Sequence, residues 1–205
     1  MGYGIKKVVG GFSSGTSVEQ MIPKTLVRTH IEHKMLRELI QVHEDLDSRS
    51  AMEFGCGYGR NLRVLKEFYP QVSGVERDEE LAQLAQELNP GCNVVNLAPL
   101  DYSGPKVDFL LTFTFLQHLT SSELQKTVDR IGNLLAPGGL LICCEETDPR
   151  NKSLPGAESF CEGRSIETYI KLFPEFTFLR SYPRELEPGS PFTTGGDYMV
   201  FRRKK

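Results

Sequence analysis

Three glycines at every second position follow a short apolar segment, and this run constrains the chain more than any other feature of the sequence. The segment 51–54 (AMEF) reads as a buried strand, and residues 61–68 (NLRVLKEF) have apolar side chains at helical spacing. The chain is therefore predicted to leave a strand, turn tightly through Gly55, Gly57 and Gly59, and enter a helix. Glycine accepts positive φ and lets a ligand approach the bare backbone, and a helix N-terminus offers unpaired N–H groups to a carboxylate or a phosphate.

The glycine run alone does not identify a ligand. Its spacing, G-x-G-x-G, differs from the dinucleotide-binding fingerprint G-x-G-x-x-G. A tight strand-to-helix turn with no ligand would use the same glycines. The segments further along the chain therefore decide how the run is interpreted.

Four landmarks follow one another across residues 51–146. They are the glycine run with the acidic residue Glu53 before it, a strand-like segment closed by the acidic residue Glu76, an apolar strand at 107–111 with the turn 116–119 after it, and the segment 134–142 (LLAPGGLLI). In this order they resemble the class I S-adenosylmethionine-dependent methyltransferases. The resemblance covers the middle of the chain well and its two ends poorly.

Strand-like and helical segments alternate through this region, which indicates a parallel sheet with right-handed crossovers. We expect one α/β domain over residues 1–205, with a seven-stranded, mostly parallel Rossmann-like sheet, helices on both faces and a C-terminal antiparallel hairpin. Within it, residues 1–47 are expected to form an N-terminal arm and a helix over the active site. Residues 51–146 are expected to form the cofactor-binding core, and residues 147–205 a C-terminal helix and the hairpin.

Helix boundaries are predicted from proline and from capping residues. The first long helix is expected to begin just after Pro23 and to bury one apolar stripe. This stripe consists of Val27, Ile31, Met35 and Leu39. Later helices are expected to have N-caps at Asp78, Thr120 and Ser165.

The resemblance implies S-adenosyl-L-methionine as the cofactor and S-adenosyl-L-homocysteine as the product. Gly55 and Gly57 would pack against the methionine portion, and Glu53 would hold its ammonium group. Glu76 would accept hydrogen bonds from the two ribose hydroxyls. The cofactor-binding residues expected on this basis are Glu53, Gly55, Cys56, Gly57, Gly59, Glu76, Arg77, Leu97, Ala98, Thr112 and Phe113.

The resembled family often has an acidic residue near position 97 or 98 for the adenine amino group, where this chain has Leu97-Ala98-Pro99. Adenine recognition is therefore expected to rest on backbone groups and apolar packing. Cys56 lies between two turn glycines, where a small side chain is all that the turn requires, so no nucleophilic role is expected for it.

Methyl transfer from a sulfonium is a direct displacement, so a base is needed only when the acceptor must lose a proton. His118 is the candidate general base, because it follows the fourth strand and histidine titrates near neutrality. The alternative is that His118 packs beside the cofactor or caps the next helix. The residues expected to contact the acceptor are Tyr3, Arg28, His30 and Glu145. His30 and His33 share a helix face, but no third ligand stands at useful spacing, so no metal site is expected.

Net charge, apolar segments and cysteine spacing argue against several classes of partner and site. The chain has 205 residues, 39% of them hydrophobic, and its formal net charge of −3 gives no electrostatic case for nucleic acid. No apolar segment approaches the length of a membrane span, no signal-peptide core opens the chain, and the five cysteines include no C-x-x-C pair. We expect a cytoplasmic monomer or homodimer with no nucleic-acid or membrane partner.

The expected function is transfer of a methyl group to an oxygen or nitrogen of a small molecule. The chain has no large insertion to recognise a macromolecule, and after Phe113 it reads Thr114-Phe115-Leu116 rather than the N-P-P-Y-type motif of amino-methylating nucleic-acid enzymes. Two alternatives stay open. An aminopropyl transferase on the same fold would need clustered carboxylates after the fourth strand, and a non-catalytic scaffold subunit would bind the cofactor without using it.

Overall fold

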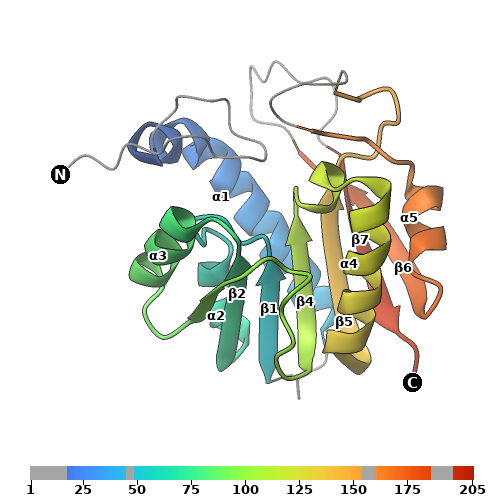
Figure 1. Cartoon of the computed structure of the whole chain (residues 1–205), viewed down its shortest axis with the longest axis horizontal. Coiled ribbons are helices and arrows are strands. Elements are labelled where there is room, and N and C mark those ends of the chain that lie inside the picture. The colour runs from blue at the N-terminus through green and yellow to red at the C-terminus, as the bar shows by residue number, and fades with distance from the viewer. Residues whose placement is uncertain (1–17, 45–48, 154–159, 186–195) are drawn as a thin grey trace.

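The computed structural model describes residues 18–44, 49–153, 160–185 and 196–205, and for residues 18–25 it describes the backbone only. Helices and strands alternate along most of the chain, with a short 3₁₀ turn after the fourth strand (Figure 1). In order, the elements are α1 (Val18–His43), β1 (Ser50–Phe54), α2 (Leu62–Phe68), β2 (Gln71–Glu76), α3 (Glu79–Leu88), β3 (Asn93–Asn96), β4 (Val107–Phe113), the 3₁₀ turn η1 (Leu116–His118), α4 (Ser121–Leu134), β5 (Leu135–Glu145), α5 (Ile166–Leu172), β6 (Phe176–Pro183) and β7 (Asp197–Arg203).

The strands form one seven-stranded sheet in the order β3-β2-β1-β4-β5-β7-β6. β1 to β5 pair in parallel, whereas β7 runs antiparallel to both β5 and β6. This arrangement confirms the predicted parallel sheet with a C-terminal antiparallel hairpin. The strand order reverses between β1 and β4, and in such sheets ligands bind outside the carboxyl ends of the strands at this reversal.

Helices cover both faces of the sheet, as predicted (Figure 1). One hydrophobic cluster joins α1, α2 and α3 to the sheet, and a second joins α4 and α5 to the opposite face. β4 serves both clusters, because Phe109 and Leu111 belong to the first and Leu110 to the second. A central strand buried on both faces must be continuously apolar, which explains the sequence of β4.

α1 differs from the prediction in two respects. It begins at Val18, so Pro23 lies inside the helix, where it removes one backbone donor from a helix of 26 residues. The predicted apolar stripe is also wrong at its start, because Val27 is 60% exposed, whereas Glu32 and Leu36 are buried. A four-residue repeat drifts by roughly 40° at each step, so a stripe extrapolated along it turns away from the sheet.

Three later helices, α3, α4 and α5, begin where their capping residues predicted. Asp78 and Ser165 each accept a hydrogen bond from the backbone N–H three residues further on. Thr120 and Glu123 form the predicted reciprocal capping box at the start of α4. These caps fix where the helices start after β2 and β4.

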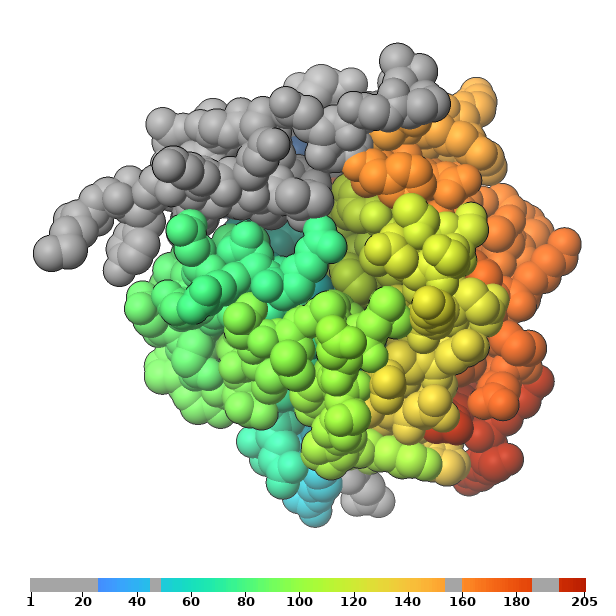
Figure 2. Space-filling view, viewed as in Figure 1, coloured from blue at the N-terminus to red at the C-terminus, as the bar shows by residue number. Residues whose placement is uncertain are grey.

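Residues 97–106 connect β3 to β4 without a helix. In the space-filling view, this green segment covers the front of the molecule between α3 and α4 (Figure 2). The buried Tyr102 packs edge-on against Phe54 of β1, with ring centroids 6.4 Å apart. Within the described residues, no helix combines the length and the apolar character needed to cross a membrane.

Candidate functional site

The three glycines after β1 all have positive φ, at 67°, 54° and 78°, but they serve different purposes. A Cβ at Gly55 would lie 2.6 Å from the ring of Phe115, and a Cβ at Gly59 would lie 2.5 Å from the amide nitrogen of Asn89. A Cβ at Gly57 would meet no atom of the described residues within 4 Å. Gly55 and Gly59 are therefore required by packing, whereas the described residues leave the backbone of Gly57 uncovered.

Glu76 connects the glycine run to the end of β2. Its Oε2 accepts a hydrogen bond of 2.9 Å from the backbone N–H of Gly57, and its Oε1 accepts one of 2.9 Å from Asp78. Each carboxylate oxygen has two lone pairs, so each can accept one further hydrogen bond. The acidic end of β2 thus lies directly beside the open glycine.

Glu53 lies beneath the same turn and is buried. Its Oε1 accepts a hydrogen bond of 2.7 Å from the side chain of Asn61, while its Oε2 has no partner among the described residues. Burial raises the pKa of Glu53 to about 8, against the opposing effects of the Asn61 hydrogen bond and the charge of Arg60. A buried oxygen without a partner usually marks a place where a ligand or a water donates.

The carboxyl end of β4 lies next to that of β1, because Phe54 pairs with Thr112 in the sheet. Thr112 and Phe113 are buried there, and Thr114 immediately after them has φ of 49°. A positive φ at a residue other than glycine stores strain and is frequent in ligand-binding turns. Local backbone strain therefore coincides with the reversal of strand order.

Glu145, at the end of β5, is fully buried and holds the turn that follows β4. Its Oε2 accepts hydrogen bonds from the backbone N–H groups of Phe115 (3.0 Å) and Gln117 (3.2 Å). Burial raises the pKa of Glu145 to about 7. The contact of Glu145 with the acceptor stays a prediction, because its Oε2 binds backbone while its buried Oε1 has no partner among the described residues.

His118 lies in the 3₁₀ turn η1, and its Nδ1 is 2.6 Å from the carbonyl oxygen of Phe160. A carbonyl oxygen can only accept, so Nδ1 carries the proton and Nε2 has the lone pair of the neutral ring. Burial, assisted by the charge of Arg77, lowers the pKa of His118, and the hydrogen bond to Phe160 opposes this shift. The ring is thereby kept neutral with Nε2 as its basic atom.

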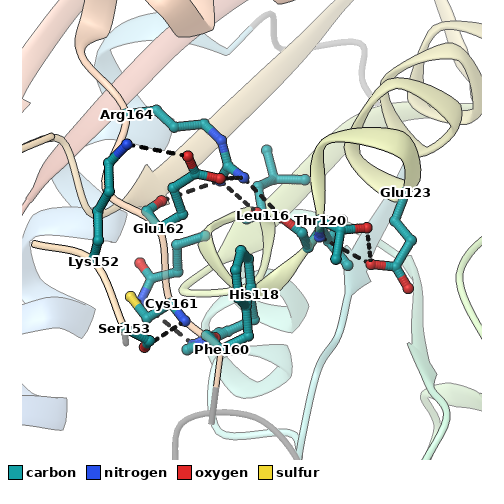
Figure 3. Close-up of polar contacts among 12 residues, drawn as sticks. Leu116, His118, Thr120, Glu123, Lys152, Ser153, Phe160, Cys161, Glu162 and Arg164 are labelled. Carbon is teal, nitrogen blue, oxygen red and sulfur yellow. Dashed lines mark hydrogen bonds and ion pairs between the residues drawn. The ribbon is translucent and has the colours of Figure 1, made fainter. Parts of the chain in front are cut away.

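The segment 160–164 clamps the same turn from the other side (Figure 3). The buried guanidinium of Arg164 donates to the carbonyl oxygens of Leu116 (3.2 Å) and Leu119 (2.8 Å), on either side of His118. Arg164 also pairs with Glu162 at 2.8 Å. The turn that carries His118 is thus fixed by β5 and by the segment before α5.

The remaining predicted residues are less closely grouped. Leu97 is 41% exposed, and its backbone N–H donates to the carbonyl oxygen of Glu76 at 3.1 Å, which places it beside the end of β2. Arg77 is exposed and Ala98 is half-buried. Cys56 is buried, and burial raises the pKa of its thiol, which agrees with the expected lack of a nucleophilic role.

The candidate residues of the N-terminal arm and of α1 differ in whether the structure describes them and in how deeply they are buried. Tyr3 lies outside the described residues, Arg28 is half-buried on α1, and His30 is exposed. His33 is buried, and its burial lowers its pKa to about 4. No three His, Cys, Asp or Glu side chains gather as metal ligands in the part of the chain that the structure describes.

Sequence reasoning missed a buried ionic cluster beside the glycine run. The carboxylate of Glu32, on α1, pairs with the guanidinium groups of both Arg60 and Arg184. Both groups also lie over the ring of Phe113, with their Cζ atoms 4.7 and 5.2 Å from its centroid. One signal was available, because Glu32 stands four residues before the buried Leu36 and so shares its helix face.

Comparisons with known proteins support the same fold. An amino pentose methyltransferase from Micromonospora echinaspora has a TM-score of 0.75 at 17% identity, over 95% of this chain and 100% of that chain. Magnesium protoporphyrin IX methyltransferase from Synechocystis PCC 6803 has a TM-score of 0.68 at 14% identity, over 94% and 87%. Mitomycin 7-O-methyltransferase has a TM-score of 0.66 at 16% identity, over 90% and 55%.

The first two of these structures contain bound S-adenosylmethionine. A search of curated protein sequences found no match. The profile of the methyltransferase domain matches residues 27–182, which is most of the chain and includes every strand from β1 to β5. The chain therefore belongs to the methyltransferase domain family.

Proposed function

We propose that this protein transfers a methyl group from S-adenosyl-L-methionine to an oxygen or nitrogen of a small molecule. The observation that carries the proposal is the pairing of Gly57 with Glu76. No described side chain covers the backbone at Gly57, and the carboxylate beside it, 2.9 Å from the Gly57 N–H, keeps lone pairs for further donors. The backbone at Gly57 suits the narrow amino-acid tail of a ligand, and the carboxylate of Glu76 suits a diol next to that tail.

The described residues fit this cofactor. Gly57 would lie along its methionine portion, and the unpartnered Oε2 of Glu53 would accept from its ammonium group. Glu76 would accept from the two ribose hydroxyls, and Leu97 with Ala98 would border the adenine. When bound, the cofactor supplies an electrophilic methyl carbon, and the protein supplies alignment and exclusion of water.

The remaining expected contacts are proposed at the edges of this cradle. Thr112 and Phe113 would border it from the end of β4, and Arg77 from the end of β2. Gly55, Cys56 and Gly59 would complete the turn that lies along the methionine portion of the cofactor, with Gly55 and Gly59 also packed from behind by the protein. Helix α1 would cover the site, with Arg28 and His30 on the acceptor side.

His118 is the proposed general base for an acceptor that must lose a proton. Its Nδ1–H is occupied by the carbonyl of Phe160, so the proton from the acceptor would pass to Nε2. A lowered pKa keeps the ring neutral at pH 7 and therefore able to accept that proton. Arg164 positions the turn on both sides of His118.

The small-molecule class is supported by the proteins of similar fold. Their acceptors, as named, are an amino pentose, magnesium protoporphyrin IX and mitomycin. We propose the same broad class here, with the chain acting as a monomer or a homodimer.

A screen with methyl-labelled cofactor tests the proposal. The protein would be incubated with pools of small hydroxyl and amine compounds, and in parallel with total RNA and with denatured and native protein. We expect label in a small-molecule pool that depends on the enzyme. Label confined to RNA or to protein would contradict the proposed acceptor class.

A further inference from the structure

Gln117, directly before His118, is held by hydrogen bonds of its backbone and of its side chain. Its backbone N–H donates to Glu145 Oε2 at 3.2 Å, and its backbone carbonyl accepts from the N–H of Glu162 at 2.8 Å. Its side-chain Oε1 accepts from the backbone N–H of Glu146 at 2.8 Å. The side chain therefore bridges the end of β5 and the turn that follows β4.

The hydrogen bond from Glu146 decides which way the carboxamide of Gln117 points. A backbone N–H can only donate, so the atom beside Glu146 is the carbonyl oxygen Oε1, and the amide nitrogen Nε2 lies on the opposite side. Nε2 is 3.4 Å from His118 Nε2 and 3.7 Å from the sulfur of Cys161. The two N–H groups of the amide thus face these two acceptors.

The ring of His118 continues the same chain of hydrogen bonds. Its Nδ1 donates to the carbonyl oxygen of Phe160 at 2.6 Å, so its Nε2 is left as the acceptor for Gln117 (Figure 3). Three hydrogen bonds therefore run in one direction, from the Glu146 N–H to Gln117, from Gln117 to His118, and from His118 to Phe160. The middle one is the longest and hence the weakest of the three.

This arrangement suits the neutral ring and opposes the protonated one. A proton on Nε2 of His118 would face the amide N–H of Gln117, so two donors would oppose each other. Turning the carboxamide would put its oxygen toward the ring, but it would leave the Glu146 N–H facing another donor. The charge of Arg77, after β2, acts against the protonated ring as well. Glu145 does not offset these effects through Gln117, because its Oε2 binds the backbone of the turn.

We propose that Gln117 is the positioning residue of the base: its amide N–H covers the lone pair of His118 Nε2 in the free protein, and an O–H or N–H of the acceptor takes its place before methyl transfer. The inference rests on the proposed function and on His118 as its base. A contact of 3.4 Å is easily displaced, and the ring is only half-buried, so Nε2 can be reached.

The exchange of donors also states what the acceptor must carry. As the oxygen or nitrogen of the acceptor takes the methyl group from the sulfonium, the S–CH₃ bond breaks and the proton of the acceptor passes to Nε2. Gln117 cannot accept that proton, so the imidazolium loses it to solvent and the amide returns. The reacting atom therefore carries a hydrogen, as in a hydroxyl or an amine, and not as in a thioether or a tertiary amine.

Nuclear magnetic resonance of the histidine ring nitrogens tests the contact without cofactor or acceptor. The signals of His118 are those that disappear in His118→Asn, and in the parent we expect the neutral ring to carry its proton on Nδ1. Gln117→Glu replaces the amide nitrogen by an oxygen that can only accept, so His118 should bind a proton at least about tenfold more tightly. Gln117→Met removes the donor and should raise the proton affinity by a smaller factor.

Gln125→Glu is the matched control, because Gln125 is exposed on α4 and the variant makes the same change of charge. It should leave the proton affinity of His118 within about twofold of the parent, since exposed charges are screened. Methyl transfer gives a second readout, with a hydroxyl or amine compound from the labelled-cofactor screen. In Gln117→Glu the acidic limb of kcat/KM should move to higher pH by the same factor as the proton affinity.

Three results would overturn the assignment. They are a neutral ring with its proton on Nε2 in the parent, a proton affinity in Gln117→Glu no higher than in Gln125→Glu, and methyl label in thioethers or tertiary amines. Should Gln117→Glu fail to fold, an unchanged proton affinity in Gln117→Met decides the second point. An acidic limb that stays in place while the proton affinity rises would instead remove His118 as the base, which is a failure of the proposed function and not of the contact.

Discussion

Gly57 and Gly59 both have positive φ, yet a methyl group at each would meet different surroundings. At Gly57 it would meet no described atom within 4 Å, whereas at Gly59 it would lie 2.5 Å from Asn89 and 3.0 Å from Ala85. Gly57→Ala should therefore cost only the backbone strain of positive φ, about 1–2 kcal/mol, and should abolish binding of S-adenosylhomocysteine. Gly59→Ala should lose more stability. Urea unfolding and calorimetry on both variants check this, and normal ligand binding by Gly57→Ala would contradict the cofactor's placement.

Glu53 predicts a proton exchange at the same site. Its pKa of about 8 means that it is mostly protonated near pH 7 in the free protein, and an ammonium group against it would drive the proton off. Binding of S-adenosylhomocysteine should therefore release a proton below pH 8, and affinity should rise with pH from 6 to 8 and then level. Titrations in buffers of different ionisation enthalpy measure the released proton. Glu53→Gln should show neither effect, and an unchanged pH dependence in this variant would contradict the role of Glu53.

The stability of the fold should respond to Glu53 with the opposite sign. A carboxyl group with a raised pKa in the folded state stabilises fully below its unfolded value near 4.5. That contribution is lost as the pH rises through about 8. The same carboxyl therefore favours folding at low pH and cofactor binding at high pH, a conflict typical of a binding residue rather than of a structural one.

At the scale of elements, the turn after β4 is held from two directions. Glu145 binds two backbone N–H groups of the turn, and Arg164 binds two of its carbonyl oxygens. A base that acts on a bound acceptor needs a fixed position, which these four hydrogen bonds provide.

His118→Asn separates the chemical role of this turn from its structural role. The asparagine amide can still donate to the carbonyl oxygen of Phe160, but it cannot accept a proton as a base. With an acceptor that must lose a proton, we expect kcat to fall by about 100-fold or more and the affinity for S-adenosylhomocysteine to change little. Single-turnover kinetics with labelled cofactor measure the effect. Full turnover in the variant would remove His118 as the base and leave it as a packing residue.

The sequence was informative where the signal is local. The glycine run, the acidic end of β2 and the helix caps each depend on a few adjacent residues, and the structure has the predicted turn and caps there. The burial of Glu145 could not be predicted, because alternation along a strand does not say which end residue turns inward. Its burial depends on the pairing of β5 with both β4 and β7.

At the scale of the whole molecule, the Glu32 cluster joins three distant parts of the chain. Glu32 and Arg184 are 152 positions apart, and Arg184 Nε lies 2.9 Å from Glu32 Oε1. No local pattern predicts such a contact, because it exists only once α1, the glycine run and the end of β6 have been brought together. The sequence for the same reason does not predict that Arg60 belongs to this buried cluster.

The buried Glu32 cluster and the exposed Arg37–Glu67 pair of α1 should contribute unequally to the free energy of unfolding. Glu32→Ala would leave two guanidinium groups beside a vacated buried site and should cost about 3 kcal/mol of unfolding free energy. Glu67→Ala removes the exposed partner of Arg37 and should cost less than about 1 kcal/mol. Urea unfolding with a constant m-value measures both. Equal losses would mean that the Glu32 cluster does not hold these three parts together.

We propose that S-adenosylmethionine lies across the carboxyl ends of β1 and β2, with its ribose on Glu76. Calorimetric titration of S-adenosylhomocysteine into the parent protein and into Glu76→Ala tests it most directly. The parent should bind one ligand per chain, and the variant should bind at least about tenfold more weakly, since two charged hydrogen bonds are lost. Absence of heat and of any thermal shift in the parent, or undiminished affinity in Glu76→Ala, would contradict the claim.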